Sequence, residues 1–336
     1  MPGVSGFQGD AVKSRRLFLV NTAALIVACR TAAAQSRKTW RLGYLSPATP
    51  DDDVPYFQAF REALRAQGYV EGSNMVIDRR LASGVELLPG LAAELVARNV
   101  DVIVAITTPA ARAAKTATDA IPIVFVGPSD PVGSGLVSTL AHPGANVTGM
   151  TDQGVDLAGK RLELLKQLVP RLKRVAALGA PADPVWEPVW SEVQVAARRL
   201  GIDMTIPMLM MTPDQLRALF ADLDRSVQAL YVAPQAILWV HREEIIKLAA
   251  RAKLPAVYEI RDYPLSGGLI SYGTDYRSLY RDAARYVDRI LKGARPGDLP
   301  VEQPREFELV INVSTAKTLG LPIPQSIRVR ANELIQ

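Results

Sequence analysis

The chain has 336 residues, of which 49% are hydrophobic and 22% charged, and a formal net charge of +5. This length exceeds the usual size of a single core and predicts two lobes. Removing residues 1–34 takes away Lys13, Arg15, Arg16, Arg30 and Asp10, which leaves a charge of +2 and argues against a nucleic-acid partner. The single cysteine excludes an intrachain disulfide and a cysteine metal cluster.

The amino terminus has the order of features typical of an export signal. A basic segment with Arg15 and Arg16 precedes an apolar stretch, residues 17–28, that is too short to span a bilayer. Three alanines, residues 32–34, then match a signal-peptidase site, and the arginine pair resembles a twin-arginine motif. We predict a signal peptide at residues 1–34 and a periplasmic protein beginning at Gln35. Lipidation of Cys29 and a buried amino-terminal helix are the alternatives.

From residue 41 the chain alternates strands and helices, as in an α/β fold. The run 121–126, IVFV within it, has the continuous apolar character of a parallel strand buried on both faces. The expected strands of the first half are 42–45, 75–81, 100–106, 121–126 and 147–151, and its helices include 55–66, 86–98 and one beginning at Pro109.

The second half continues the same alternation. We expect strands at 175–178, 204–210, 229–232 and 256–258, separated by helices at 156–168, 184–200, 213–223 and 237–252. Residues 269–272 are expected to return as a strand to the first lobe, followed by a helix at 276–291, and residues 307–313 to cross again. The predicted fold is α/β, with two Rossmann-like lobes of parallel sheet joined by a three-stranded hinge. The amino-terminal lobe would comprise 40–148 and 269–303, and the carboxy-terminal lobe 149–268 and 304–336.

Polar residues at the carboxyl ends of the strands are the candidate ligand-binding residues, because open α/β sheets bind ligands there. Hydroxyl groups and helix N-termini suit a carboxylate, and carboxylates suit an ammonium group. Helix capping is the alternative for Ser46, Thr107, Thr108 and Asp130. An aromatic ligand would stack on a ring such as Tyr258 or Trp186, although for Trp186 partial burial on a helix surface is favoured. The candidates are Ser46, Thr107, Thr108, Ser129, Asp130, Asp183, Tyr231, Tyr258, Tyr272 and Asp275.

Three segments carry a resemblance to a known family. They are residues 121–135 (IPIVFVGPSDPVGSG), 266–275 (SGGLISYGTD) and 299–321 (LPVEQPREFELVINVSTAKTLGL), with further similarity at 71–74 and 91–101. They resemble the tryptophan-receptor-type substrate-binding proteins of ABC transporters, and the similarity extends over residues 41–335. The resemblance implies a type I periplasmic binding fold that closes on an amino acid, often an aromatic or branched one.

We therefore expect an exported receptor that captures a small solute and delivers it to a membrane ABC permease. No catalytic residue, metal site or cofactor is expected, because no paired acid and base, nucleophile elbow or metal-spaced histidines occur. The receptor is expected to be a monomer. The alternatives are the ligand-sensing domain of a signalling system and an enzyme built on the same two-lobed fold.

Overall fold

The computed structural model describes residues 2–3, 38–82, 84–204, 208–209, 212 and 214–336. The predicted signal peptide lies outside these residues, apart from positions 2–3. Residues Trp40–Gln336 form one compact unit. Within the described part of the chain, no helix has the length and apolar character needed to cross a membrane.

The first sheet is fully parallel and has the strand order β2-β1-β3-β4-β5. Its central strands consist of apolar, mostly β-branched residues, and every residue of β3 and β4 is buried. Because all five strands run in one direction, their carboxyl ends lie at one edge. The strands are β1 (Trp40–Ser46), β2 (Met75–Leu81), β3 (Val102–Ile106), β4 (Ile123–Val126) and β5 (Val147–Met150).

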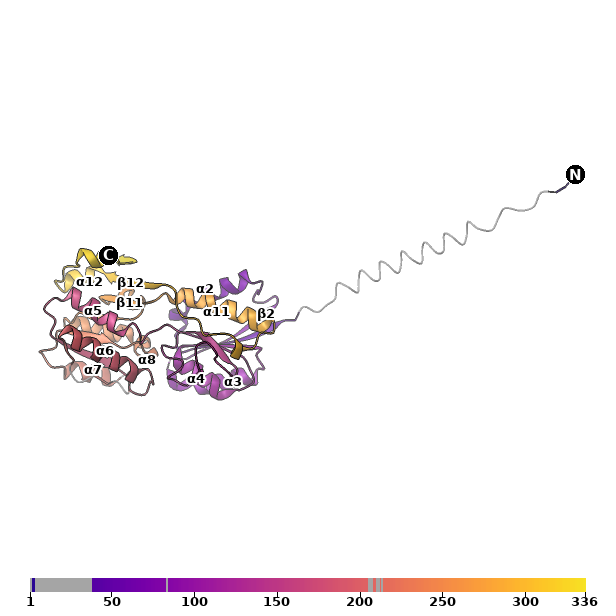
Figure 1. Ribbon diagram of the computed structural model, residues 1–336, viewed down its shortest axis with the longest axis horizontal. Helices are drawn as coiled ribbons and strands as arrows, with labels where there is room; N and C mark the ends of the chain where they lie inside the picture. The colour runs from indigo at the N-terminus through magenta and orange to yellow at the C-terminus, as the bar shows by residue number, and fades with distance from the viewer. Residues whose placement is uncertain (1, 4–37, 83, 205–207, 210–211, 213) are drawn as a thin grey trace. The chain divides into compact units, whose positions relative to one another are not determined.

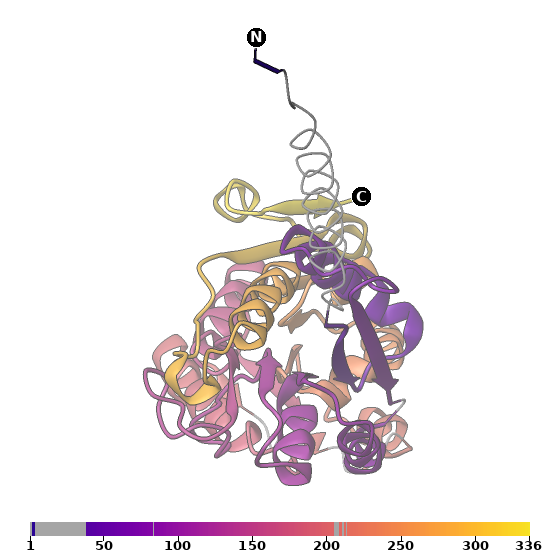
Figure 2. The same cartoon turned by 90° about the vertical axis from the view of Figure 1, so that its right-hand side faces the viewer.

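Helices cover both faces of this sheet, because alternate strand residues point to opposite sides. Val102 packs in one cluster with Phe57 and Leu279, whereas Ile103 packs in another with Leu95. Figure 2 shows the strands with helices on either side. One face carries α2 (Pro50–Ala66) and α11 (Tyr276–Leu291), and the other α3 (Leu88–Ala97) and α4 (Thr107–Ala117). We call this sheet with its four helices the first lobe.

The second sheet has the order β13-β12-β11-β10-β9-β6-β7, with β8 also paired to β6. All its pairs are parallel except β11 with β12. Its strands are β6 (Arg174–Gly179), β7 (Asp203–Met204), β8 (Met208–Leu209), β9 (Ala229–Val232), β10 (Ala256–Tyr258), β11 (Ile270–Thr274), β12 (Phe307–Asn312) and β13 (Glu333–Ile335).

Eight helices accompany the second sheet in the described residues, and together they form the second lobe (Figure 1). They are α5 (Ala158–Leu168), α6 (Trp186–Leu200), α7 (Gln215–Ala221), α8 (Ala236–Val240), α9 (Arg242–Arg251), α10 (Asp262–Leu265), α12 (Val313–Thr318) and α13 (Gln325–Arg328). Short 3-10 turns occur at Val85–Leu87 and Pro296–Asp298.

One strand lies in a different sheet from the one expected. We predicted that residues 269–272 return to the first lobe, but β11 pairs with β10 and β12 in the second sheet. The chain enters the first lobe only after Thr274, where α11 begins and packs along α2 (Figure 1). A short strand carries no sequence mark of which sheet it joins, so the pattern placed the crossing too early.

Three segments connect the lobes, and hydrogen bonds to their backbone carbonyls hold them together. Thr151 N–H donates to the carbonyl of Glu302 at 3.0 Å, and Glu302 N–H donates to that of Gly149, also at 3.0 Å. The hydroxyl of Thr274 donates to the carbonyl of Asp152 at 2.7 Å. The three crossings of the described chain therefore meet in one hinge.

A buried arginine strengthens this hinge from the second lobe. Arg161 of α5 is only 1% exposed. Its Nε donates to the carbonyl of Tyr272 at 2.7 Å, and a terminal nitrogen donates to that of Gly154 at 2.8 Å. A buried guanidinium must be hydrogen-bonded to be tolerated, and here the two carbonyls come from two different hinge segments.

Candidate functional site

A cavity lies between the two lobes at the carboxyl ends of the strands. Its empty space is about 590 Å³, which includes space that is open to solvent. Residues of both lobes and of the hinge line it. They include Ser46, Asp53, Tyr56, Thr107, Thr108, Ser129, Asp152, Asp183, Trp239, Glu259, Ile260, Tyr276 and Tyr280.

The N-terminus of α4 opens into this cavity without a side-chain cap. Thr107, its first residue, has φ of 72°, a left-handed conformation that is costly for a β-branched residue. The Thr107 hydroxyl is buried and has no hydrogen-bond partner among the described residues. Thr108 follows it and is 6% exposed. Free helix N–H groups and hydroxyl donors at this point suit a ligand carboxylate or carbonyl.

Among the described residues, four carboxyl groups line the cavity, and no lysine, arginine or histidine does. Burial raises the pKa of each of the four, which are Asp53, Asp152, Asp183 and Glu259. The negative charge of Asp152 raises the pKa of Glu259 further, while the charge of Arg161 opposes the increase. A ligand ammonium placed among these groups would favour their charged forms.

The structure fixes two of these carboxylates firmly. Asp152 accepts hydrogen bonds from the Tyr276 hydroxyl and, at 2.7 Å, from Gly154 N–H. Asp53 accepts from the Tyr44 hydroxyl at 2.5 Å and from Arg79 at 2.6 Å, so its charge is already paired. Asp152, Asp183 and Glu259 are therefore the groups available for a cationic ligand group.

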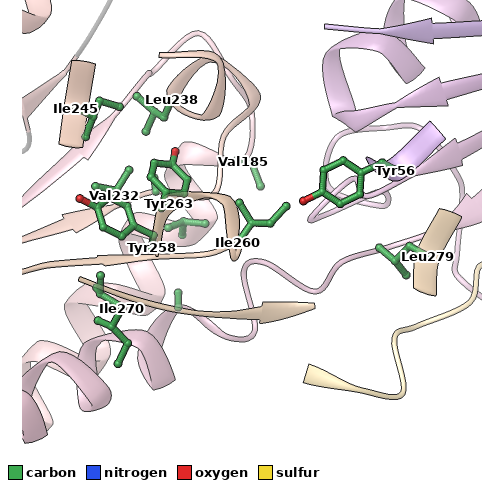
Figure 3. Close-up of a cluster of buried hydrophobic side chains, with 14 of the residues drawn as sticks. Tyr56, Val185, Val232, Leu238, Ile245, Tyr258, Ile260, Tyr263, Ile270 and Leu279 are labelled. Atoms are coloured by element: carbon green, nitrogen blue, oxygen red, sulfur yellow. The ribbon is translucent and has the colours of Figure 1, made fainter. Parts of the chain in front are cut away.

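Aromatic side chains from both lobes form the walls of the cavity. The ring of Tyr56 lies 5.5 Å from that of Tyr280 and 6.3 Å from that of Tyr276. Figure 3 shows Tyr56 with its hydroxyl directed toward the segment of Ile260 in the second lobe. Trp239 lines the cavity from the second lobe. Such walls suit an aromatic or apolar ligand group.

The structure brings five of the ten predicted residues to the cavity. Each lies at the carboxyl end of a strand or within four residues after it, as expected from the sheet topology. Ser46, which is fully buried, also accepts a hydrogen bond from Ala48 N–H at 3.2 Å. These five residues are Ser46, Thr107, Thr108, Ser129 and Asp183.

Two of the predicted carboxylates do not line the cavity and instead cap backbone. Asp130 accepts from Gly133 N–H at 2.7 Å and so caps a turn, where the alternative considered was the cap of a helix. Asp275 is the N-cap of α11 and accepts from Arg277 N–H at 2.9 Å.

The three predicted tyrosines pack elsewhere in the second lobe. Tyr231 is fully buried in the core, and Tyr258, 1% exposed, stacks on Tyr263 with 4.3 Å between ring centroids (Figure 3). Tyr272 packs against Phe307 on β12 at 6.2 Å. Trp186 lies on α6, as favoured from the sequence, but it is fully rather than partly buried and stacks on Trp190.

Several lining residues were not identified from the sequence. Asp53 and Tyr56 are three positions apart on α2, and Tyr276 and Tyr280 are four apart on α11, so each pair shares a helix face. The spacing can be read from the sequence, but it does not indicate that these faces of α2 and α11 line a cavity. Asp152 and Glu259 each lie within two residues after a strand, where the search for polar groups could have found them.

Comparison with known proteins gives a consistent assignment. The family model described as ABC transporter substrate binding protein matches residues 53–335. The chain is 31% identical over 271 residues to the tyrosine-binding protein of Clostridioides difficile (strain R20291), covering 79% of this chain and 76% of that protein.

Two solved structures are similar along their whole length. A conserved domain protein from Vibrio cholerae has a TM-score of 0.83 and 30% identity, with 88% of this chain and all of that chain covered. The ABC domain from Streptococcus pneumoniae, solved with L-Trp, has a TM-score of 0.83 and 26% identity, with 89% and 100% covered.

These similarities confirm the predicted type I periplasmic binding fold and the predicted role as a binding protein rather than an enzyme. Proteins of this role act outside the cytoplasm together with a membrane permease. The chain belongs to the family of ABC transporter substrate-binding proteins.

Proposed function

We propose that this protein captures an aromatic amino-acid-like solute between its lobes and delivers it to an ABC permease. One observation carries the proposal: a single cavity joins the uncapped N-terminus of α4 to the carboxylates of Asp152, Asp183 and Glu259. A carboxyl group and an ammonium group of one small molecule would find complementary partners there. The aromatic walls and the tyrosine- and L-Trp-binding relatives support an aromatic side chain.

The remaining predictions belong to the same proposal. The protein is exported to the periplasm by residues 1–34, matures at Gln35 and acts as a monomer without a nucleic-acid partner. Because β11 pairs within the second sheet, the amino-terminal lobe comprises 40–148 with 275–303 and the carboxy-terminal lobe 149–274 with 304–336, in place of the predicted 269–303 and 149–268.

Calorimetric titration of the purified protein tests the proposal. We expect L-tyrosine or L-tryptophan to bind, and tyramine and 4-hydroxyphenylpropionate, which each lack one charged group, to bind more weakly. Losing a charge-assisted hydrogen bond costs about 1.5–3 kcal/mol, or at least tenfold in affinity.

Two variants locate the site in the same experiment. Thr108→Val removes a hydroxyl that lines the cavity and should weaken binding, whereas Asp130→Asn alters a carboxyl group outside it and should not. No heat of binding with any aromatic amino acid, from protein that unfolds cooperatively, would contradict the proposed solute class.

A further inference from the structure

A second cavity adjoins the first between the same two lobes. The two share Thr108 and Pro109 of α4 and Asp183 of the second lobe as lining residues. The second has about 1250 Å³ of free space, against about 590 Å³ in the first, and it is partly open to solvent. A solute held in the first cavity can therefore extend past Thr108 and Asp183 into the second.

The walls of the second cavity are mainly apolar and short. Leu88, Pro89 and Ala113 contribute from the first lobe, and Ala182 and Ile237 from the second. Such a surface suits an apolar ligand group of modest size. Contact with these side chains removes apolar area from water, and because the side chains are short they leave room for the group.

One cation, Arg112, lies among these apolar residues. The other charged groups that line this cavity are Glu86 and Asp183. The guanidinium of Arg112 is exposed on α4 and makes no hydrogen bond or ion pair with the described residues. Its charge does act on Asp183, whose pKa it lowers against the effect of burial. An unpaired guanidinium beside an apolar surface is a suitable partner for a ligand carboxylate.

The junction between the cavities favours a peptide group over a free carboxylate. Thr108 offers a hydroxyl donor there, and Asp183 offers a carboxylate acceptor. A free α-carboxylate at the junction would be attracted by the N-terminus of α4 but would also face the like charge of Asp183. A peptide group brings one carbonyl acceptor and one N–H donor, which complement both side chains.

We propose that the natural solute is a short peptide with a free aromatic amino-terminal residue, whose second residue occupies the second cavity. This rests on the proposed function, because the amino-terminal ammonium and ring use the first cavity as described above. The peptide group lies between Thr108 and Asp183, a small apolar second side chain lies against Ala113 and Ile237, and the terminal carboxylate meets Arg112. One extended residue spans roughly 3.5 Å, and the two cavities share Thr108 and Asp183 as lining residues, so the second residue can reach the second cavity.

Calorimetric titration with three ligands tests this inference: L-tyrosine, tyrosyl-alanine and tyrosyl-alanine amide, which lacks the terminal charge. We expect tyrosyl-alanine to bind about tenfold more tightly than L-tyrosine. The amide should lose on the order of fivefold, the size of one partly exposed charge pair.

Arg112→Gln identifies the partner of the terminal carboxylate. This variant should weaken tyrosyl-alanine by about fivefold, leave the amide unchanged and leave L-tyrosine within twofold. Arg65→Gln is the matched control, because Arg65 is also an exposed arginine of the first lobe but lies in the last turn of α2, outside both cavities. The control should bind all three ligands as the unaltered protein does.

The outcomes separate the two proposals. Tight binding of L-tyrosine with weaker binding of tyrosyl-alanine would overturn the peptide inference and leave the proposed function intact. Equal loss of the peptide and its amide in Arg112→Gln would also overturn it, since the second cavity would then be only an access route. Failure of all three ligands to bind folded protein would overturn both.

Discussion

Tyr56 of the first lobe donates its hydroxyl hydrogen to Asp262 of the second lobe, with 2.5 Å between Tyr56 Oη and Asp262 Oδ1. The other oxygen of Asp262 accepts from Trp239 Nε1 at 2.8 Å. Tyr56 and Trp239 both line the cavity from opposite lobes. One carboxylate therefore joins two walls of the site, and separation of the lobes must break the bond to Tyr56.

Tyr56→Phe keeps the ring and removes this bond between the lobes. We expect solute affinity to fall about tenfold, because a hydrogen bond to a charged acceptor contributes about 1.5–3 kcal/mol and exists only when the lobes are closed. Tyr69→Phe is the matched control: Tyr69 donates to Asp288 at 3.0 Å within the first lobe. It should lower the free energy of unfolding without changing affinity, and equal affinities of Tyr56→Phe and the unaltered protein would contradict the role.

Arg242 and Asp52 form a second link between the lobes. Their side chains are only 10% and 17% exposed, and the guanidinium lies 5.2 Å from the ring centre of Trp239. In a double-mutant cycle with Arg242→Gln and Asp52→Asn, we expect a coupling of about 1–2 kcal/mol in solute affinity. The cycle for Arg261 and Glu308, which pair at 3.0 Å within the second lobe, should show coupling in unfolding instead. Coupling absent from affinity would mean that the pair does not depend on closure.

The left-handed conformation of Thr107 predicts an unusual order of stabilities. Thr107→Ala and Thr107→Gly both remove the hydroxyl, but only glycine adopts a φ of 72° without strain. We expect the glycine variant to have a free energy of unfolding about 1 kcal/mol above that of the alanine variant, and both to bind solute more weakly. Urea denaturation measures the first difference and calorimetry the second. An alanine variant at least as stable as the glycine variant would show that the backbone is not strained here.

The titration of Glu308 should make the free energy of unfolding depend on pH. Burial raises the pKa of its carboxyl from the ordinary 4.5 to about 7, although Arg261 opposes the increase. The folded protein thus holds this proton more tightly than the unfolded chain does. Its contribution is complete below pH 4.5, is lost between pH 4.5 and 7, and is absent above pH 7. The loss should amount to about 1–3 kcal/mol.

Denaturation at successive pH values compares two variants. Glu308→Gln cannot titrate and should lose this decline between pH 4.5 and 7, whereas Glu192→Gln, an exposed position on α6, should retain it. An unchanged decline in Glu308→Gln would assign it to another group.

The sequence predicted the strands well because buried parallel strands have a composition that is independent of their neighbours. Residues 121–126 were identified as a strand from their apolar, β-branched run, and the structure places β4 at Ile123–Val126. The sheet that a strand joins depends on distant partners, so β11 was assigned to the wrong lobe. The sequence likewise did not show what the helix faces of Tyr56 and Tyr276 contact, because that depends on how the helices pack in the folded protein.

Two of the predicted site residues are each adjacent in sequence to a residue that lines the cavity. Tyr258 was expected in the cavity but is buried in the core, while its neighbour Glu259 lines the cavity. Ser129 and Asp130 show the same shift, with Ser129 at the cavity and Asp130 capping a turn. Successive side chains of an extended chain point to opposite sides. An error of one position therefore selects a side chain that points away from the cavity.

Asp152 belongs to the hinge through its backbone and to the cavity through its carboxylate. A solute that binds this carboxylate therefore contacts the hinge itself. Motion about a pivot grows with distance from it, so a displacement of a fraction of an ångström there becomes a much larger one at the outer rims of the lobes. In the proposed function, the permease would meet the outer rims of the lobes, and the hinge would convert binding of the solute at Asp152 into a displacement of those rims.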